Sequence, residues 1–234
     1  MKKQLLGAML LIAALIVTGC GNKKQKEQAS RQEERKTIEM EPNQLLIVVD
    51  PQVDFTTGSL ATAKGPEAMD RLAEAINNGI LNKYSWVAVT QDAHPANHCS
   101  FVENGGVFPP HCVQGTEGMN VYPNLQNAFD THKEGVNYVY LQKGNLPERE
   151  EFSIFQNELC GTKLRETILD KNYDIIDVCG IATDYCVYET VKDLMEFYPA
   201  KQIRIVTNCI AAVDDNDTKL ADLMKEKGIE GITF

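Results

Sequence analysis

The sequence predicts an α/β fold, in which helices cover both faces of a doubly wound, mainly parallel six-stranded sheet. Two observations support this prediction. Apolar runs of strand length alternate along the chain with segments whose apolar residues recur at helical spacing. Several of these runs are apolar at successive positions, which is typical of strands that are covered on both faces.

Six runs have strand character because consecutive or alternate residues are apolar. The section between the second and third runs is predicted to be irregular. The runs cover residues 45–49, 86–90, 136–141, 175–179, 203–207 and 232–234.

Four segments between these runs have helical spacing. Pro66 and Gly79 mark the two ends of the first helix. Thr183 or Asp184 is the expected N-cap of the third, and Thr218 that of the last. The four segments cover residues 66–79, 162–170, 187–195 and 218–227.

The first 19 residues have the pattern of a secretory signal peptide. Two lysines follow the first methionine, an unbroken apolar stretch covers residues 5–17, and small residues lead to Cys20. That stretch is shorter than the roughly 20 residues that span a bilayer. The ending resembles the lipobox of bacterial lipoproteins, which implies cleavage before Cys20 and an exported protein that a lipid on Cys20 anchors to the periplasmic or surface side of a membrane. A plain cleaved signal and an uncleaved anchor are the alternatives.

The composition changes twice after the signal. Residues 20–43 are rich in Lys, Glu, Gln and Arg and contain no aromatic residue, so this segment is predicted to be a flexible, charged tether. Residues 44–234 are long enough to form one domain with a full core. The formal net charge of −10, with no basic stripe, argues against nucleic acid as a partner. The six cysteines after Cys20 show no compact disulfide spacing, although a bridge between two of them stays open.

Chemically active side chains follow four of the predicted strands. Asp50, Asp92 and Lys143 come at or just after the ends of the first three strands, and the turn with Cys186 follows the fourth. Because the carboxyl ends of parallel strands meet at one edge, where α/β proteins bind ligands, we expect these side chains to lie together. Cys186 would lie in the first turn of a helix, where unpaired N–H groups favour a thiolate. A small residue packed against the sheet is the alternative.

A second group consists of one acid and three of the four histidines in the chain. Asp92 and His94 are two residues apart, so in an extended segment they point the same way, and His98 and His111 can reach in from the following loop. One carboxylate with two or three imidazoles suits zinc, iron or manganese. The sequence therefore predicts one divalent metal ion, with zinc as the first choice. Histidines on a surface loop are the alternative.

Five segments resemble, in order and spacing, the motifs of the nicotinamidase branch of the isochorismatase-like cysteine hydrolases. The metal motif indicates this branch, because related isochorismatases generally lack it. The segments cover residues 47–55, 90–98, 109–116, 143–144 and 180–187.

The resemblance implies a role for each matching residue. Cys186 matches the nucleophile, Asp50 the general acid and base, and Lys143 the third member of the triad. The peptide bond between Ile181 and Ala182 matches a cis bond, which directs the N–H groups of Ala182 and Cys186 into an oxyanion hole.

The other matches are to metal ligands, to pocket walls and to one structural acid, Asp54. His98 matches a position that ligates in some members only, whereas three residues match constant ligands. The metal ligands are Asp92, His94 and His111, and the pocket positions are Phe55, Leu60, Phe108 and Ile181.

The implied reaction is hydrolysis of nicotinamide to nicotinate and ammonia through a thioester, with the metal ion orienting the pyridine ring. The sequence departs from the family at Phe108, where tryptophan is common, at Ala93, where an aromatic residue is usual, and in the acidic segment 145–151. These departures affect the expected pocket size and substrate preference. Another small amide or a carbamoyl compound is the nearest alternative substrate, and a homo-oligomer stays open.

Two other classes of function fit parts of the pattern. The acid and histidines could form the facial triad of a non-haem iron oxygenase, although that chemistry needs neither Cys186 nor Lys143. The chain could also be a non-catalytic surface lipoprotein that binds a metal ion or a pyridine compound, although an intact triad argues against this.

Overall fold

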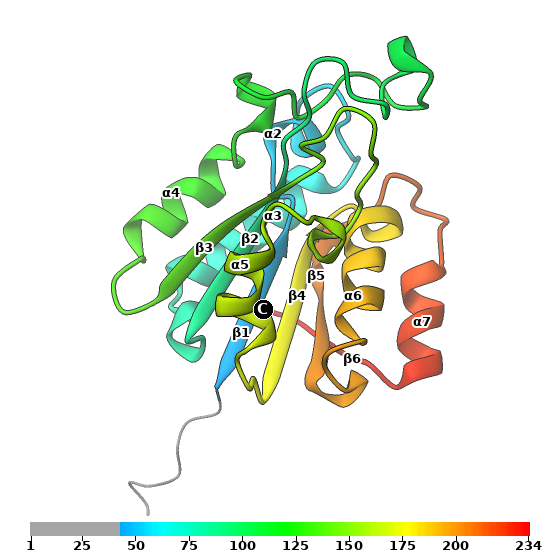
Figure 1. The fold of residues 1–234 in the computed structure, drawn as a ribbon. Coiled ribbons are helices and arrows are strands. Elements are labelled where there is room, and N and C mark those ends of the chain that lie inside the picture. Colours follow the sequence, from blue (N-terminus) through cyan, green and yellow to red (C-terminus); the bar gives the residue numbers. More distant parts are fainter. Residues whose placement is uncertain (1–42) are drawn as a thin grey trace, which may run out of the picture. The chain divides into compact units, whose positions relative to one another are not determined.

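The computed structural model describes residues 43–234, and a six-stranded sheet forms its centre (Figure 1). The strand order is β3-β2-β1-β4-β5-β6, and every neighbouring pair is parallel. The predicted fold class is therefore confirmed. The strands are β1 (Gln44–Val49), β2 (Trp86–Asp92), β3 (Asn137–Lys143), β4 (Ile175–Ile181), β5 (Ile203–Ala211) and β6 (Glu230–Ile232).

Helices cover both faces of the sheet, as Figure 1 shows. One core contains α3 and α4, and the other contains α5, α6 and α7. The α-helices are α2 (Val53–Thr56), α3 (Gly65–Asn77), α4 (Pro123–Thr131), α5 (Gly161–Leu164), α6 (Tyr188–Leu194) and α7 (Lys219–Lys227). Single 3-10 turns cover Ile80–Lys83, Val102–Asn104, Glu117–Met119, Ile154–Gln156 and Ala200–Gln202, and π-turns cover Arg165–Leu169 and Thr183–Val187.

The sequence of β1 shows why its apolar run is continuous. Leu46 and Val48 pack into the core under α3, whereas Leu45, Ile47 and Val49 pack into the opposite core. All five side chains are fully buried. A strand that is covered on both faces needs an apolar residue at every position.

Several elements differ from the prediction. Helix α4 lies in the section that was expected to be irregular; Pro123 begins it, and Leu125, Ala128 and Phe129 form its buried face. Strand β6 ends at Ile232, where the predicted last strand begins. Thr218 occupies the predicted N-cap position of α7, but its hydroxyl donates to the carboxylate of Asp222 and not to the backbone.

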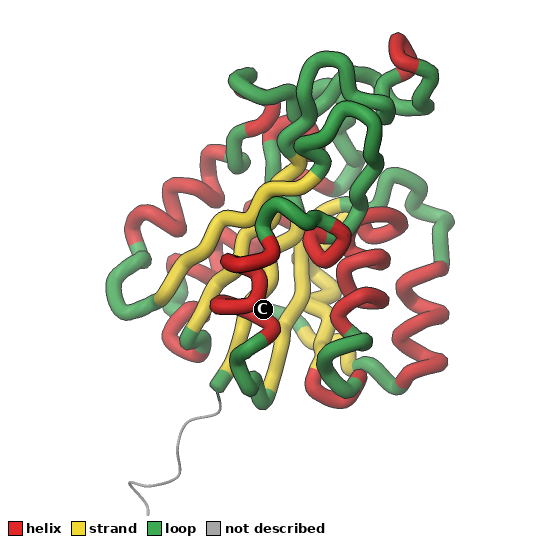
Figure 2. The backbone as a smooth tube through the Cα atoms, viewed as in Figure 1, coloured by secondary structure: helices red, strands yellow, loops and turns green. Residues whose placement is uncertain are grey.

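The order of the sheet creates one switch point. The chain passes from β1 to β2 and β3 on one side, whereas β4, β5 and β6 lie on the other side of β1. Figure 2 shows the long loops gathered beyond the carboxyl ends of the central strands. In open α/β sheets, ligands bind at this edge, beside the strands where the order reverses.

The predicted signal peptide, Cys20 and the tether up to residue 42 lie outside the described residues. Within residues 43–234, no helix has both the length and the hydropathy needed to cross a bilayer. The six cysteines in this part of the chain are free thiols.

Candidate active site

Three reactive side chains meet at the switch point. Asp50 directly follows β1, Lys143 is the last residue of β3, and Cys186 lies in the π-turn that follows β4. Asp50 and Lys143 are fully buried, and Cys186 is 5% exposed. The Lys143 ammonium lies 2.9 Å from Asp50 Oδ2 and donates to Cys186 Sγ at 3.4 Å. The structure thus brings together the predicted acid, cation and thiol.

Asp50 is held by the neighbouring strand. It has a positive φ of 44°, and its N–H donates to the carbonyl of Thr90 at 3.1 Å. The Thr90 hydroxyl in turn donates to Asp50 Oδ1 at 2.7 Å, which leaves Oδ2 for the ion pair with Lys143. Burial raises the pKa of Asp50, and the positive charge of Lys143 opposes this rise.

Lys143 is a fully charged ammonium in a buried setting. Its Nζ also donates to Asp92 Oδ1 at 2.5 Å and to the carbonyl of Glu151 at 3.3 Å. Burial lowers the pKa of Lys143, but the carboxylates of Asp50 and Asp92 outweigh burial and raise the pKa well above its usual value. One cation therefore pairs with two buried anions, and this group carries an excess negative charge.

Cys186 is a neutral thiol at rest. Burial raises its pKa well above that of a free cysteine, and the charge of Lys143 opposes the rise. The sulfur and one carboxylate oxygen from each of Asp50 and Asp92 lie within 4.8 Å of one another. A base is therefore close enough to receive the thiol proton.

The turn that carries Cys186 is shaped by its backbone. The Ile181–Ala182 peptide bond is cis, as the resemblance implies. The carbonyl of Ala182 accepts hydrogen bonds from the N–H groups of Tyr185 at 3.1 Å and Val187 at 2.9 Å. The N–H of Cys186, which lies between them in the sequence, is not bonded to this carbonyl.

The predicted N-cap of this turn is wrong. Ala182 occupies the cap position, and no side chain caps the turn. The carboxylate of Asp184 instead accepts from the N–H groups of Val213 and Asp214, both at 2.9 Å. Asp184 therefore holds the loop after β5 against the nucleophile turn.

Asp92, His94 and His111 form a group that suits a metal ion, since one donor atom from each lies within 4.8 Å of the others. The Nδ1 atom of His94 lies 3.1 Å from the carbonyl oxygen of Gly144. Because a carbonyl only accepts, Nδ1 carries the proton and Nε2 offers its lone pair. That Nε2 is buried and has no hydrogen-bond partner among the described residues. His111 Nδ1 is likewise paired with the Pro109 carbonyl at 2.8 Å.

The charges of this group also suit a divalent cation. Burial acts to raise the pKa of Asp92, but Lys143 and His94 outweigh it, so the pKa is lowered and the carboxylate stays ionised. Burial lowers the pKa of His111, which keeps its imidazole neutral. The nearby Asp92 carboxylate raises the pKa of His94, so a cation at Nε2 of His94 would replace a proton that this carboxylate favours. A carboxylate with two imidazoles is a donor set that binds zinc, iron or manganese.

His98 belongs to a neighbouring group. Its Nε2 donates to the Arg149 carbonyl at 3.0 Å, and its Nδ1 accepts from the Ser100 N–H at 3.2 Å. Its ring lies 4.0 Å from that of His94 between centroids, and His94, His98 and Glu150 form a second set of closely spaced donors. Ligation by His98 stays a prediction.

Asp54 holds the loop that carries His111. Its carboxylate accepts from the N–H of Cys112 at 2.7 Å and from the N–H of Ser59 at 3.0 Å. The Ser59 hydroxyl also donates to the carbonyl of Pro110 at 2.7 Å. These contacts agree with the structural role expected of Asp54.

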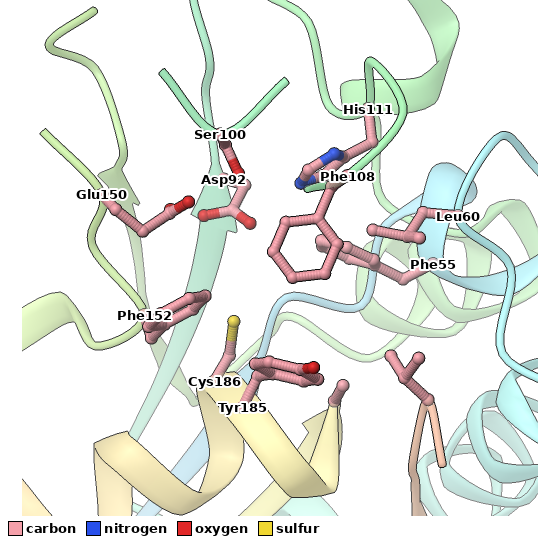
Figure 3. A pocket seen from close by; sticks show the side chains of 12 residues that line it. Phe55, Leu60, Asp92, Ser100, Phe108, His111, Glu150, Phe152, Tyr185 and Cys186 are labelled. Carbon is pink, nitrogen blue, oxygen red and sulfur yellow. The ribbon is translucent and has the colours of Figure 1, made fainter. Parts of the chain in front are cut away.

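A pocket of about 360 Å³ opens above the sulfur of Cys186 (Figure 3). Figure 3 shows aromatic side chains around the sulfur, with Asp92 and Glu150 on one side. Phe55, Leu60 and Phe108 line the pocket as expected, whereas Ile181 does not and its neighbour Ala182 does. The lining residues that the sequence did not single out are Ser100, Glu150, Phe152, Tyr185 and Val213.

This site lies in a domain that matches a known family. The model of the isochorismatase domain matches residues 44–233, which is almost all of the described chain. The chain belongs to the isochorismatase family. Its curated relatives include a nicotinamidase of Escherichia coli (30% identical over 211 residues; 82% of this chain and 94% of the relative) and a nicotinamidase/pyrazinamidase of Mycobacterium tuberculosis (33% over 184 residues; 75% and 90%).

Solved structures agree with this assignment to the isochorismatase family. A pyrazinamidase of Pyrococcus horikoshii in complex with zinc is 28% identical, with a TM-score of 0.67, and covers 82% of this chain and 100% of its own. PnC1 from L. infantum in complex with nicotinate is 29% identical, with a TM-score of 0.63, and covers 83% of this chain and 94% of its own.

Most of the pocket residues that the sequence analysis did not single out lie close to motifs that it did identify. Tyr185 adjoins the nucleophile, and Glu150 and Phe152 lie in the segment after the lysine motif. Val213 follows the end of β5, at the same rim as the other reactive residues. Ser100 carries no signal of this kind.

Proposed function

We propose that this protein is a nicotinamidase, which hydrolyses the carboxamide of nicotinamide to nicotinate and ammonia. The observation that carries the proposal is the ammonium of Lys143, 2.9 Å from Asp50 and 3.4 Å from the sulfur of Cys186, beneath a small aromatic pocket. The names of the relatives support the substrate, and the complex of L. infantum PnC1 with nicotinate supports the product.

Proton transfer from Cys186 to Asp50 begins the reaction. Burial raises the pKa of the Asp50 carboxyl, so it is a stronger base than a free aspartate, and Lys143 stabilises the thiolate that forms. The thiolate then attacks the carbonyl carbon of the amide. The cysteine needs this help because its resting thiol is neutral.

Backbone N–H groups stabilise the tetrahedral intermediate. We assign this role to those of Ala182 and Cys186, which lie in the turn that carries the nucleophile. One such donor is worth about 3 to 4 kcal/mol in a comparable hole. Collapse of the intermediate breaks the carbon–nitrogen bond, and the nitrogen takes the proton from Asp50 and leaves as ammonia.

Hydrolysis of the thioester completes the cycle. Asp50 removes a proton from water as the water oxygen attacks the thioester carbon. The carbon–sulfur bond then breaks, and the sulfur of Cys186 recovers the proton from Asp50. The acid product ionises to nicotinate.

The pocket suits a flat aromatic amide. Phe55, Phe108, Phe152 and Tyr185 line it, so a pyridine ring would pack against other rings. The cavity of about 360 Å³ includes space that is open to solvent, so the volume enclosed by these side chains is small and suits a single-ring amide.

Asp92, His94 and His111 would hold one divalent metal ion, and zinc fits their donor chemistry. The zinc complex of the P. horikoshii relative supports this choice. When bound, the ion would supply a Lewis acid that orients the ring nitrogen of the substrate. The attacking sulfur and the proton carrier come from Cys186 and Asp50.

Replacement of the nucleophile tests this mechanism. Cys186→Ala should abolish ammonia release from nicotinamide and pyrazinamide, because no other group can form the thioester, while bound metal stays at the native level. Cys160→Ala, at a half-buried cysteine outside the pocket, is the control. Substantial turnover by Cys186→Ala would falsify covalent catalysis, and a rate that depends on oxygen would favour the oxygenase alternative.

We also propose that the mature protein begins at Cys20, carries a lipid on that residue and is anchored to the outer side of a bacterial membrane. The apolar stretch that ends in small residues before Cys20 supports this proposal. Mass spectrometry of the mature N-terminus should find a lipid-modified Cys20, and Cys20→Ala should move the protein out of the membrane fraction. A free thiol on Cys20 would contradict lipidation.

A further inference from the structure

Glu151 is a buried acid that the mechanism above does not use. It lies eight residues after Lys143 and is 1% exposed. Its charged partner is Arg149, whose Nε lies 3.4 Å from Oε1 and whose side chain is 40% exposed. Oε1 has no hydrogen-bond partner among the described residues. A carboxylate so deeply buried is costly to keep unless its contacts are needed.

The other carboxylate oxygen holds the turn after β3. Glu151 Oε2 accepts from the N–H of Gly144 at 2.8 Å and from Nδ2 of Asn157 at 2.7 Å. Gly144 is also the residue whose carbonyl accepts from Nδ1 of His94 at 3.1 Å. One glycine therefore links the Glu151 carboxylate to a metal-binding imidazole.

Gly144 fits closely against that imidazole. Its φ is +63°, and a Cβ atom at this position would lie 2.4 Å from Cε1 and 2.6 Å from Nδ1 of His94. Gly144 has no side chain that could hold the turn, so the orientation of the turn depends on the hydrogen bonds of the Gly144 backbone. The Glu151 carboxylate makes the charge-assisted bond that fixes it.

Glu151 also touches the reactive triad through its backbone, because its carbonyl accepts from Nζ of Lys143 at 3.3 Å. Hydrogen bonds also hold the segment that follows Glu151. Ser153 and Gln156 form a capping box around the turn Ile154–Gln156. Side chains held in place by such contacts keep the groups that they bind in position.

We propose that Glu151 is a positioning residue that sets the orientation and tautomer of His94 through Gly144, and so makes Nε2 of His94 available to the metal ion. This inference rests on the metal site of the proposed function. Loss of a hydrogen-bond partner that orients a metal-ligating residue typically weakens metal binding about 10- to 100-fold. The effect of Glu151 is expected on metal affinity first and on turnover as a consequence.

Zinc binding to the purified mature protein tests the inference. The metal-free protein is titrated with zinc in competition with a chromophoric chelator. Glu151→Ala should raise the zinc Kd about 10- to 100-fold. Glu151→Gln, which keeps an acceptor for the Gly144 N–H, should bind zinc more tightly than Glu151→Ala. Glu158→Gln, which removes the exposed acid that also pairs with Arg149, is the matched control and should bind zinc like the native protein.

Rescue by zinc separates positioning from simple stabilisation. Glu151→Ala should regain turnover when zinc is raised until the site fills, which a variant with a merely weakened fold would not do at a temperature below its unfolding. Glu151→Asp keeps the charge but is one methylene too short to reach Gly144. Glu151→Asp should therefore bind zinc more weakly than the native protein. This variant provides the test if Glu151→Ala does not fold.

Two results would overturn the inference. If Glu151→Ala and Glu151→Asp bind zinc with the same Kd as the native protein, the inference fails while the metal site stands. If the native protein binds no zinc, the metal site of the proposed function fails and the inference fails with it.

Discussion

Lys143 has more acceptors around it than an ammonium group has protons. Asp92, Asp50, the Glu151 carbonyl and the sulfur of Cys186 lie 2.5, 2.9, 3.3 and 3.4 Å from Nζ, in that order. Three N–H bonds must therefore be shared among four neighbours. The single positive charge connects the metal-binding carboxylate to the reactive acid and to the thiol.

Removal of this charge should be costly. Lys143→Met leaves Asp50 and Asp92 buried without a cation, and the free energy of unfolding should fall by about 3 to 5 kcal/mol. The variant should also release no ammonia. Urea denaturation of the metal-free protein measures the stability, with Lys163→Met on the exposed surface of α5 as the control.

The pH dependence of this variant has a defined sign. Without Lys143, burial raises the pKa of the Asp50 carboxyl unopposed, so the folded variant binds more protons than the unfolded chain. Its stability should therefore rise as the pH falls toward the ordinary pKa of aspartate. A loss of stability no larger than that of Lys163→Met, or a loss that grows on acidification, would contradict this account.

At the scale of elements, the contact between β1 and β4 positions the nucleophile turn. Gly180 pairs with Val49 in the parallel ladder and has a φ of +117°. A Cβ atom on Gly180 would lie 2.0 Å from the Val49 carbonyl oxygen. Only glycine allows β4 to approach β1 this closely, directly before the turn that carries Cys186.

Gly180→Ala should separate the two strands at this point. We expect a loss of about 2 to 4 kcal/mol in the free energy of unfolding, from the strained φ and the clash together, and a lower kcat because Cys186 moves. Thermal and urea unfolding with steady-state kinetics measure both effects. Gly161→Ala in α5, where a Cβ atom meets nothing within 4 Å, should be neutral or stabilising. Equal effects at the two glycines would refute the role of Gly180.

The central strands and the rim of the sheet could be predicted from the sequence, and the supporting contacts could not. Asp50, Asp92 and Lys143 were placed correctly because buried parallel strands are apolar almost throughout, which makes their ends visible. The sequence predicts Thr183 or Asp184 as the cap of the nucleophile turn, but the Asp184 carboxylate instead accepts from the N–H groups of Val213 and Asp214. The sequence places Glu151 in an acidic segment but gives no sign of its contact with Gly144, because tertiary packing brings these two residues together.

At the scale of the whole molecule, the metal ion should act as a staple between segments far apart in the chain. Asp92 is the last residue of β2 and His94 follows this strand, whereas His111 comes from a separate loop. A ligand that binds only the folded state, at 100 times its Kd, stabilises a protein by about 2.7 kcal/mol. Zinc should therefore raise the unfolding temperature of metal-free protein, and His111→Ala should remove most of this rise. The same rise in the histidine variant would place the ion elsewhere.

The burial of Cys186 bears on how long the enzyme would last outside the cell. Peroxide attacks thiolates far faster than thiols, and burial raises the pKa of the Cys186 thiol, which favours its protonated form. The desolvation that makes the resting cysteine a weak nucleophile therefore also makes it a poor target for oxidants. In the exported lipoprotein that we propose, burial would therefore protect the cysteine on which catalysis depends from oxidising surroundings.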